Sequence, residues 1–424
     1  SNHYLNHDFA KYIDDVSLYD HSQSATAFRT GIGEWFFRQS AFPNAEDNSE
    51  AYYAHYYHKL DEATQTTWKQ LVEKRAGLND ALDEMIDQHQ LLAFDLVGFT
   101  ALFSQTVASL AMARRIKASK PDVMTVLGGP QCDAEMGMEL ATQTAQFDAI
   151  FSGPALESFP QFVGHLLGED RTACDTINGV FTQTNRNHWP GSSQGSQIGI
   201  LGDPADINDC IPLDYDAFLT DLNTAFPDGS QKPALLFETS RGCWWAQREA
   251  CTFCGLNGLH MRHQHMTPEN AIAHLRSLYR YAPQCNILMG VDTALPQGYT
   301  EHVLPHAPTP EGMSLFYELR PGYTAEQIGV LVEAGVRAFQ PGIESLATAS
   351  LKLMHKGTTA FQNIQFLKSC SAHPLRLDWN LLVFSPGEVE TTYDKMLHDI
   401  PLLTHLAPPS GAYPIGFVRF SRYF

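Results

Sequence analysis

The sequence contains no long hydrophobic run and no positively charged leader. No apolar stretch approaches the roughly 18 residues that a membrane-spanning helix requires. The first residues, SNHYLNHDFAKYI, are polar and lack the basic start of a secretory signal peptide. These absences predict a cytoplasmic protein that has no membrane as a partner. The sequence also lacks an initiator methionine, so we expect the natural chain to begin upstream of residue 1.

Positive charge is scarce as well, because 28 Lys and Arg residues stand against 47 Asp and Glu residues. The formal net charge of −19 repels phosphate backbones and anionic lipid headgroups. We therefore expect no nucleic acid among the main partners, whereas a neutral or cationic peptide would be tolerated. The length of 424 residues is enough for two or three domains with ample cores.

Cysteines are too few and too scattered for a disulfide framework in a chain of this size. Isolated cysteines, which we interpret as mostly small core residues, are Cys132, Cys174, Cys210, Cys285 and Cys370. The other three, Cys243, Cys251 and Cys254, form a C-x7-C-x2-C pattern within SRGCWWAQREACTFCGLNG. This grouping predicts a metal-binding loop in a reducing compartment.

Between residues 94 and 184, apolar strands alternate with amphipathic helices. The expected strands lie at 94–103, 123–129, 147–153 and 179–184, and the expected helices at 106–120, 132–145 and 157–168. Repeated β-α units of this length predict a parallel, doubly wound sheet. Ligands of such sheets bind beyond the carboxyl ends of the strands, where Gln105, Gly129 and Gly153 lie.

A second β/α series follows a stretch rich in Gly, Ser, Asn, Asp and Pro. Its expected strands lie at 233–240, 286–292, 314–320, 336–345, 375–385 and 415–421. Helices between them, capped by Thr267 and Thr324, complete an open, partial (β/α)6 barrel with its chemistry at the carboxyl ends of the strands. The predicted boundaries are a first domain at 1–190 with a helical N-terminal part, a linker at 191–230 and a barrel at 231–424.

Three kinds of site fit the clustered cysteines. Zinc prefers closed tetrahedral sites, and C-x2-C is a common half-site that His260 or His263 could complete. A disulfide would require an oxidising compartment. A [4Fe–4S] cluster held by three thiolates leaves one iron open for another ligand. Such an open site suits a loop that follows a barrel strand.

The wider sequence resembles a known enzyme family. It contains ETSRGCWW, CTFCGLNG, QPGIESL, LMHKGTTAFQNIQFLK, WNLLVFSPGE and LLTHLAPPSGAYPI. These strings are similar to those of cobalamin (B12)-binding radical S-adenosylmethionine (SAM) enzymes, in particular the RiPP or bacteriocin maturation radical SAM protein 1 family. RiPPs are ribosomally made, post-translationally modified peptides. The usual cysteine spacing is C-x3-C-x2-C, and the longer first gap is a feature of this group. The similarity is clearest from residue 90 onward, and relatives continue into a further C-terminal region.

The resemblance implies a fold and cofactors. The chain would be an α/β protein, with an N-terminal doubly wound Rossmann-like cobalamin-binding domain followed by a partial (β/α)6 radical SAM barrel. Cys243, Cys251 and Cys254 would ligate a [4Fe–4S] cluster, and the open iron would bind SAM. An electron donor such as flavodoxin or ferredoxin would supply the reducing electron.

The reaction that the resemblance implies is C-methylation of an unactivated carbon in a ribosomally made precursor peptide. It would proceed through a 5′-deoxyadenosyl radical and methylcobalamin, and no catalytic side chain is assigned. Two alternatives stay open. One is radical SAM peptide modification without methyl transfer, such as epimerisation, a crosslink or a rearrangement. The other is a non-catalytic, zinc-stabilised peptide-binding protein.

By the same resemblance, residues at strand ends and in the cysteine loop would contact SAM. They are Phe253, Asp292, Glu318, Arg320, Gly342, Glu344, Ser345 and Asn380. Several also have a structural interpretation: Asp292 could cap a helix, and Glu318 could pair with Arg320. Asn380 lies in the string WNLLVFSPGE, which reads VFSPGE where relatives tend to have GFPGE. Trp244 and Trp245 would wall the site against water, or simply bury area under the loop.

The cobalamin contacts that the resemblance implies lie at the strand ends of the first sheet. They are Thr100, Leu102, Ser104, Gln105, Gly128, Gly129, Ser152 and Gly153. Related cobalamin domains carry D-x-H-x-x-G, then S-x-L, then a Gly pair; here the first is absent and TAL replaces the second. The histidine that the first motif gives to cobalt is therefore missing, as it is in peptide-modifying relatives. A degenerate sheet without cofactor is the alternative.

Overall fold

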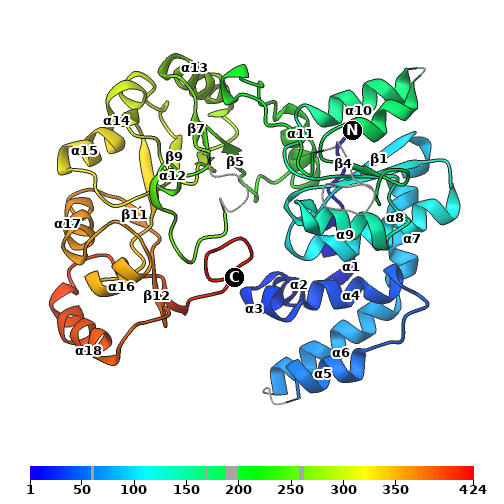
Figure 1. Cartoon of the computed structure of the whole chain (residues 1–424), viewed down its shortest axis with the longest axis horizontal. Helices are drawn as coiled ribbons and strands as arrows, with labels where there is room; N and C mark the ends of the chain where they lie inside the picture. The colour runs from blue at the N-terminus through cyan, green and yellow to red at the C-terminus, as the bar shows by residue number, and fades with distance from the viewer. Residues whose placement is uncertain (59–61, 169, 188–198, 257–261) are drawn as a thin grey trace. The chain divides into compact units, whose positions relative to one another are not determined.

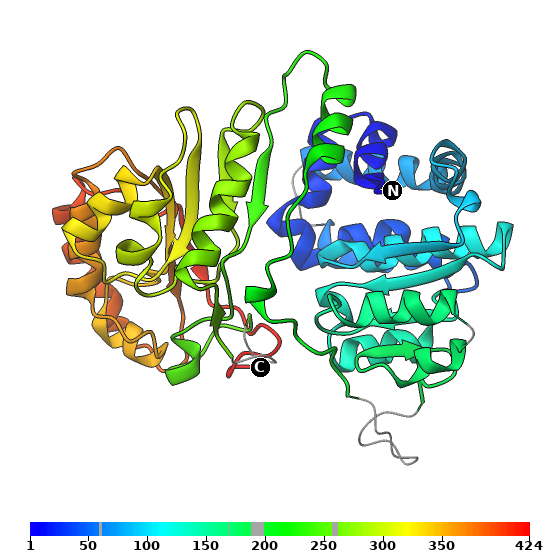
Figure 2. The same cartoon turned by 90° about the horizontal axis from the view of Figure 1, so that it is seen from above.

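The computed structural model describes residues 1–58, 62–168, 170–187, 199–256 and 262–424. They form two compact units, Ser1–Ala205 and Asp206–Phe424, each with its own sheet and core (Figures 1 and 2). No helix in these ranges combines the length and the apolar surface needed to span a bilayer. His260, which we considered as a zinc ligand, lies outside the described residues.

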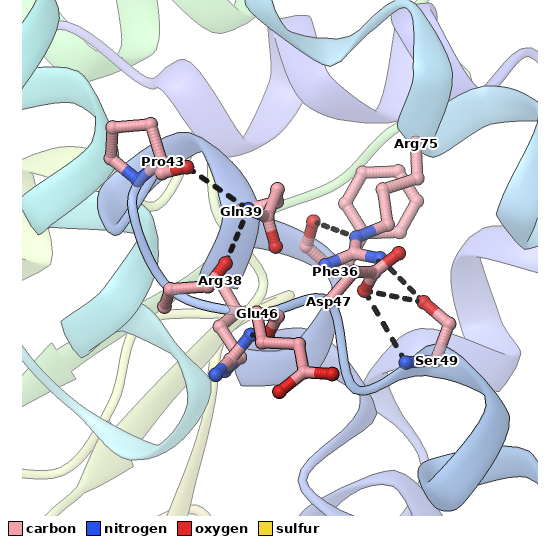
Figure 3. Close-up of polar contacts among 9 residues, drawn as sticks. Phe36, Arg38, Gln39, Pro43, Glu46, Asp47, Ser49 and Arg75 are labelled. Atoms are coloured by element: carbon pink, nitrogen blue, oxygen red, sulfur yellow. Dashed lines mark hydrogen bonds and ion pairs between the residues drawn. The ribbon is translucent and has the colours of Figure 1, made fainter.

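Helices precede the first strand and pack around an aromatic core. They are α1 Leu5–Ile13, α2 Val16–Gln23, α3 Ala25–Thr30, α4 Ile32–Ala41, α5 Ser49–Tyr56, α6 Glu62–Ala76 and α7 Leu78–Gln88. The Trp35 and Trp68 rings are buried, with their centroids 4.4 Å apart. Arg75 fixes the connection between α4 and α5, because it donates to the Phe36 carbonyl at 3.2 Å and to Asp47 at 3.1 Å (Figure 3).

The first sheet has the order β1 Leu96–Thr100, β2 Met124–Gly128, β3 Ala149–Phe151 and β4 Val180–Thr182. β1, β2 and β3 are parallel, as predicted, and α8 Thr106–Ser119 and α9 Glu135–Gln143 connect them. β4 is antiparallel to β3, so the prediction of a parallel sheet throughout is wrong at this strand. The reason is the 3₁₀ segment Arg171–Thr176. It packs against α10 Ser158–Leu167 and returns the chain to the carboxyl end of β3 before β4 begins.

Alternating side chains of this sheet enter two different cores. Val97, Leu127 and Ile150 pack on one face with α8 and α9. Val126 and Phe151 pack on the other face with α10. Helices therefore cover both faces, which confirms the doubly wound architecture that the strand and helix pattern predicts.

The second unit is a partial barrel of parallel strands. One sheet has the order β11 Arg376–Leu377, β10 Val336–Pro341, β9 Ser314–Leu319, β8 Ile287–Gly290 and β5 Ala234–Phe237. β12 Asn380–Val383 pairs in parallel with β13 Gly411–Pro414, and a bridge between Glu344 and Leu381 joins this pair to the end of β10. The six-stranded partial barrel is thus confirmed, although the expected strand at 375–385 is split into β11 and β12.

The last expected strand is misplaced. We predicted it at 415–421, whereas the chain pairs with β12 at Gly411–Pro414. The segment IGFVRFS is rich in apolar residues, which is typical of a buried strand. In the structure, however, Phe417 and Val418 are exposed. The residues that do pair include a Gly and a Pro, which are depleted in strands, so the pattern conceals them.

Helices lie along the outer side of the barrel strands (Figure 1). The helices of this unit are α11 Asp216–Ala225, α12 Ala246–Glu249, α13 Pro268–Leu278, α14 Tyr299–His302, α15 Ala325–Glu333, α16 Thr348–Leu353, α17 Ala360–Cys370 and α18 Glu390–Asp399. Thr267 and Thr324 cap α13 and α15, as predicted. Leu219 of α11 enters the barrel core, so the second half of the expected linker is part of this unit.

Candidate functional site

The cysteine loop lies over a cavity at the carboxyl ends of the barrel strands. β5 leads into the loop through β6 Ser240–Arg241, which pairs with β7 Gln264–His265. The cavity has a volume of about 370 Å³, and Cys243, Cys251 and Cys254 all line it. All three are free thiols, and burial is the main cause that raises the pKa of Cys254. The sequence pattern and the barrel topology thus bring the three thiols to one place.

The three thiols are compatible with an iron–sulfur cluster. No group of three His, Cys, Asp or Glu side chains among the described residues is arranged to hold a single ion. Closed zinc sites need four such donors at bonding distance of one centre. In a cluster, each of the three thiolates that line the cavity would bind a different iron atom.

The long first gap docks the cysteine loop onto residues 353–357. Trp245 Nε1 donates to the His355 carbonyl at 3.0 Å, and the Thr252 amide donates to the Met354 carbonyl at 3.0 Å. The Trp245 ring lies so close to Gly357 that a Cβ added there would be 2.1 Å from it. Gly357 also has a φ of +71°, which favours glycine. Trp245 in the gap and Thr252 just after it therefore fasten the loop to these residues.

Six of the eight expected SAM contacts line the cavity: Phe253, Glu318, Arg320, Gly342, Glu344 and Asn380. They come from the cysteine loop, from the carboxyl ends of β9 and β10, and from the first residue of β12, and the topology places these segments side by side. Burial raises the pKa of Glu318, and the nearby Glu344 carboxylate raises it further. No hydrogen bond from another described residue reaches the Glu318 carboxylate, which leaves it available to a ligand.

Asp292 and Ser345 do not line the cavity. Asp292 is fully buried and accepts hydrogen bonds from the amides of Thr239 (2.7 Å) and Ser240 (2.8 Å), so it fastens the end of β5. Burial raises its pKa to about 6. The Ser345 hydroxyl is buried and accepts from the Ala347 amide at 3.1 Å. Both residues lie beyond the ends of β8 and β10, and their side chains are bonded inside the protein and not directed to the cavity.

Lys356 is a cavity residue that sequence reasoning missed. Its ammonium lies 2.9 Å from Glu344 Oε1 and 5.7 Å from the centre of the Phe253 ring. Gly342 makes room for it, because a Cβ there would be 2.6 Å from Lys356 Nζ. The signal was LMHKGTT, a string that supported the family resemblance but received no role. Further lining residues without an assigned role are Thr293, Gln340, Asp378, Trp379, Phe420 and Arg422.

The first unit contains a second, larger cavity of about 770 Å³ beside β1. Four of the expected cobalamin contacts line it: Thr100, Leu102, Ser104 and Gln105. Most of its other walls are apolar and aromatic side chains from α1, α4, α7 and α8. This combination of an apolar chamber and a few polar groups at its rim is typical of a ligand site.

The other four expected cobalamin contacts, Gly128, Gly129, Ser152 and Gly153, do not line this cavity. Gly129 has a φ of +106°, and a Cβ there would lie 2.7 Å from the Ala101 carbonyl oxygen. Ser152 is buried, and its hydroxyl donates to the Ile200 carbonyl at 2.7 Å. The glycine at 129 therefore allows two loops to approach closely, and residues 200–202 cover the end of β3.

A carboxylate from α4 lies at the N-terminus of α8. Glu34 Oε2 accepts a hydrogen bond from the Val107 amide at 2.8 Å. Burial raises the pKa of this carboxyl. Helix N-termini in Rossmann-like sheets commonly bind a ligand phosphate. Here a carboxylate of the chain already occupies that position, which disfavours a nucleotide phosphate at α8.

Comparisons with known proteins agree with this arrangement. Residues 237–400 match the model of the Radical SAM superfamily. No curated protein matches the chain. Among solved structures, the cobalamin-dependent S-adenosylmethionine radical enzyme OxsB, with aqua-cobalamin and S-adenosylmethionine bound, aligns with a TM-score of 0.59 and 18% identity over 81% of this chain.

A second solved structure is similar to the same extent. The radical S-adenosylmethionine methyltransferase TsrM from Kitasatospora setae, with cobalamin and a [4Fe–4S] cluster bound, aligns with a TM-score of 0.58 and 15% identity over 83% of this chain. The alignments cover 53% of the OxsB chain and 67% of the TsrM chain, so this chain spans about half of the former. At these identities the likeness is one of fold. Residues 237–400 form a radical SAM domain, which implies a [4Fe–4S] cluster and SAM as its cofactors.

Proposed function

We propose that this protein is a cobalamin-dependent radical SAM enzyme that methylates an unactivated carbon of a ribosomally made precursor peptide. The observation that carries the proposal is the placement of three free cysteines on one cavity at the carboxyl ends of a partial barrel. That cavity belongs to a radical SAM domain. The N-terminal unit supports the cobalamin part, because both OxsB and TsrM align over more than four fifths of the chain.

Cys243, Cys251 and Cys254 would hold the cluster, and the charged groups opposite them would orient SAM. The free Glu318 carboxylate suits the SAM ammonium, since a carboxylate pairs well with a charged donor. The Lys356–Glu344 pair would meet the SAM carboxylate and ribose. When bound, the cluster and SAM would supply hydrogen-atom abstraction, and cobalamin would supply the methyl group. Flavodoxin or ferredoxin is the proposed electron donor.

Cobalamin would bind to the first unit, with its nucleotide tail in the 770 Å³ cavity. Ser104 and Gln105 at the cavity rim would donate to the tail, and the apolar wall would exclude water from it. The phosphate of that tail would have to lie away from the start of α8, because the Glu34 carboxylate already accepts from the Val107 amide there.

One observation favours a second candidate, radical SAM peptide modification without methyl transfer. Residues 200–202 cover the end of β3, where the Ser152 hydroxyl is already bonded to the Ile200 carbonyl. A corrinoid resting on this strand end would have to displace them. Product stoichiometry separates the candidates, because methyl transfer yields S-adenosylhomocysteine and 5′-deoxyadenosine together, whereas the second candidate yields only 5′-deoxyadenosine.

The test is anaerobic purification and reconstitution with iron, sulfide and hydroxocobalamin, followed by metal analysis and by SAM cleavage with dithionite as reductant. We expect four irons and one cobalt per chain, and 5′-deoxyadenosine as a product. The variant Cys254→Ala should lose the iron and the product, while Cys210→Ala, a cysteine outside the cavity, should keep both. Stoichiometric zinc without iron in the wild type would contradict the proposal.

A further inference from the structure

Arg320 is a buried cation without an acidic partner. It is the residue directly after β9, and only 9% of its surface is exposed. No carboxylate among the described residues forms an ion pair with it. A buried charge is costly unless an opposite charge or several hydrogen bonds compensate it. An anion other than an aspartate or a glutamate would offset this charge.

The nearest candidate for that anion is the sulfur of Cys251. Arg320 Nη1 lies 3.9 Å from Cys251 Sγ, and the cysteine is 8% exposed. The second terminal nitrogen, Nη2, donates to the Lys356 carbonyl. A neutral thiol would not offset the guanidinium charge, whereas a thiolate bound to an anionic cluster would.

The two tryptophans of the long cysteine gap hold the guanidinium in this position. Arg320 Cζ lies 4.6 Å from the centre of the Trp245 ring and 5.6 Å from that of Trp244. Aromatic faces at these distances attract a cation. Trp245 is itself fixed by its bond to the His355 carbonyl and by its contact with Gly357. The arginine is thus held by two rings, one carbonyl and one sulfur.

We propose that Arg320 is a positioning residue that raises the reduction potential of the cluster, and that Trp244 and Trp245 lie in the long gap to hold it. This inference rests on the proposed [4Fe–4S] cluster. Adding an electron makes the cluster more negative, so a donor and a positive charge beside a ligating sulfur stabilise the reduced state. The role differs from the SAM contact that the resemblance implied for Arg320, because it acts on the cluster through the sulfur of Cys251 and not on SAM.

The test is a redox titration of the reconstituted holoprotein, followed by electron paramagnetic resonance without SAM or peptide. In Arg320→Gln, we expect the ratio of reduced to oxidised cluster at a fixed solution potential to fall about tenfold, or about 59 mV for a one-electron couple. Arg320→Lys should restore part of the shift, since it keeps the charge but loses the planar donors. Arg248→Gln is the matched control, because this exposed guanidinium lies 5.8 Å from the same Trp245 ring; it should leave the potential unchanged.

If Arg320→Gln fails to retain iron, a second variant tests whether the guanidinium affects the reduction potential. Trp244→Leu removes one ring beside the guanidinium, and the Trp244 indole nitrogen has no hydrogen-bond partner in the described structure to lose. We expect the reduction potential of the cluster to fall, but by less than in Arg320→Gln. An unchanged potential in an iron-loaded Arg320→Gln protein, or in Trp244→Leu where the former does not load, overturns the inference. A wild type that binds no cluster overturns the proposed function instead.

Discussion

At the scale of single residues, the candidate site depends on close approaches that only particular side chains allow. Gly342 leaves room for Lys356, which pairs with Glu344 at 2.9 Å. Glu344 has a φ of +59°, a left-handed conformation that is uncommon for residues other than glycine. Such outliers persist where the surrounding structure determines them, and they gather at functional sites.

Gly342→Ala should weaken SAM binding about tenfold without much loss of stability. The new Cβ would be 2.6 Å from Lys356 Nζ, but the flexible end of this lysine can move away at little cost. Moving it would break the pair with Glu344 and disturb the groups that face SAM. Equilibrium dialysis with reconstituted protein measures the affinity. The control is Gly329→Ala in α15, where a Cβ meets nothing within 4 Å; equal affinities in the two variants would refute the role of this pair.

Asp292 should give the protein a distinctive pH dependence. Its pKa is raised to about 6 in the folded state by burial, so the folded state binds more protons than the unfolded state between about pH 4 and 6. The contribution of Asp292 to stability therefore falls as the pH rises through this window, by up to about 3 kcal/mol. It stays constant above the window.

Asp292→Asn tests this, because an amide can accept both backbone N–H bonds and donate to the Thr239 hydroxyl. Urea unfolding of both proteins at several pH values gives the difference between their free energies of unfolding. The contributions of the other carboxylates are the same in both proteins and cancel in this difference. The wild type should lose stability relative to the variant between pH 4 and 6. A difference that does not vary with pH would contradict the raised pKa.

At the scale of elements, the cysteine loop and residues 353–357 form one packed assembly. The Trp245 ring covers Gly357, and α12 contributes Glu249, which lies 2.9 Å from His355. This pair is substantially exposed and contributes little stability. The packing of the ring on the glycine is the stronger constraint, since neither the ring nor the backbone can yield easily.

Gly357→Ala should destabilise the barrel unit by about 2–4 kcal/mol and lower its iron content. The substitution combines a positive φ with a Cβ 2.1 Å from the Trp245 ring. Gly229→Ala separates the two causes, because Gly229 has a φ of +67° but a Cβ there meets nothing within 4 Å. Denaturant unfolding and iron per chain are the measurements. If the two variants lose stability equally, the contact with Trp245 is unimportant.

Sequence patterns located most elements but not all of their directions. The predicted strands at 123–129 and 314–320 and the helix at 106–120 match the structure closely, because apolar periodicity and caps act locally. The direction of β4 depends on how a 3₁₀ segment packs on α10, which no local pattern encodes. That the three cysteines lie together at the end of a barrel strand could be predicted from spacing and position. Lys356 could not, because its approach to Glu344 depends on a left-handed backbone and on Gly342.

At the scale of the whole molecule, two units provide two chambers of different character. The barrel cavity of about 370 Å³ is lined by thiols and charged groups, while the chamber of about 770 Å³ in the first unit is mostly apolar. A charged ligand such as SAM suits the first, and a bulky cofactor tail suits the second. The two cavities thus belong to different units, Ser1–Ala205 and Asp206–Phe424.

Leu102→Trp should reduce cobalamin retention at least tenfold while leaving the iron content unchanged. Leu102 lines the larger cavity, so an indole there would fill part of the space proposed for the nucleotide tail. The control Leu167→Trp changes an 84% exposed leucine of α10 that does not line this cavity. Cobalt and iron per chain after reconstitution and gel filtration are the readouts. Full cobalt retention in Leu102→Trp would place the tail elsewhere.

If the proposed cluster is present, the buried charge of Arg320 would make the packing of the cysteine loop depend on it. If oxygen removes the cluster, the guanidinium stays buried beside a neutral thiol, and the loop that carries Cys251 loses the anion that holds it in place. Opening of the loop would expose Trp244 and Trp245 together with the chain around them, which is the kind of segment that proteases cleave first. Loss of the proposed cluster would in this way make the loop more susceptible to cleavage.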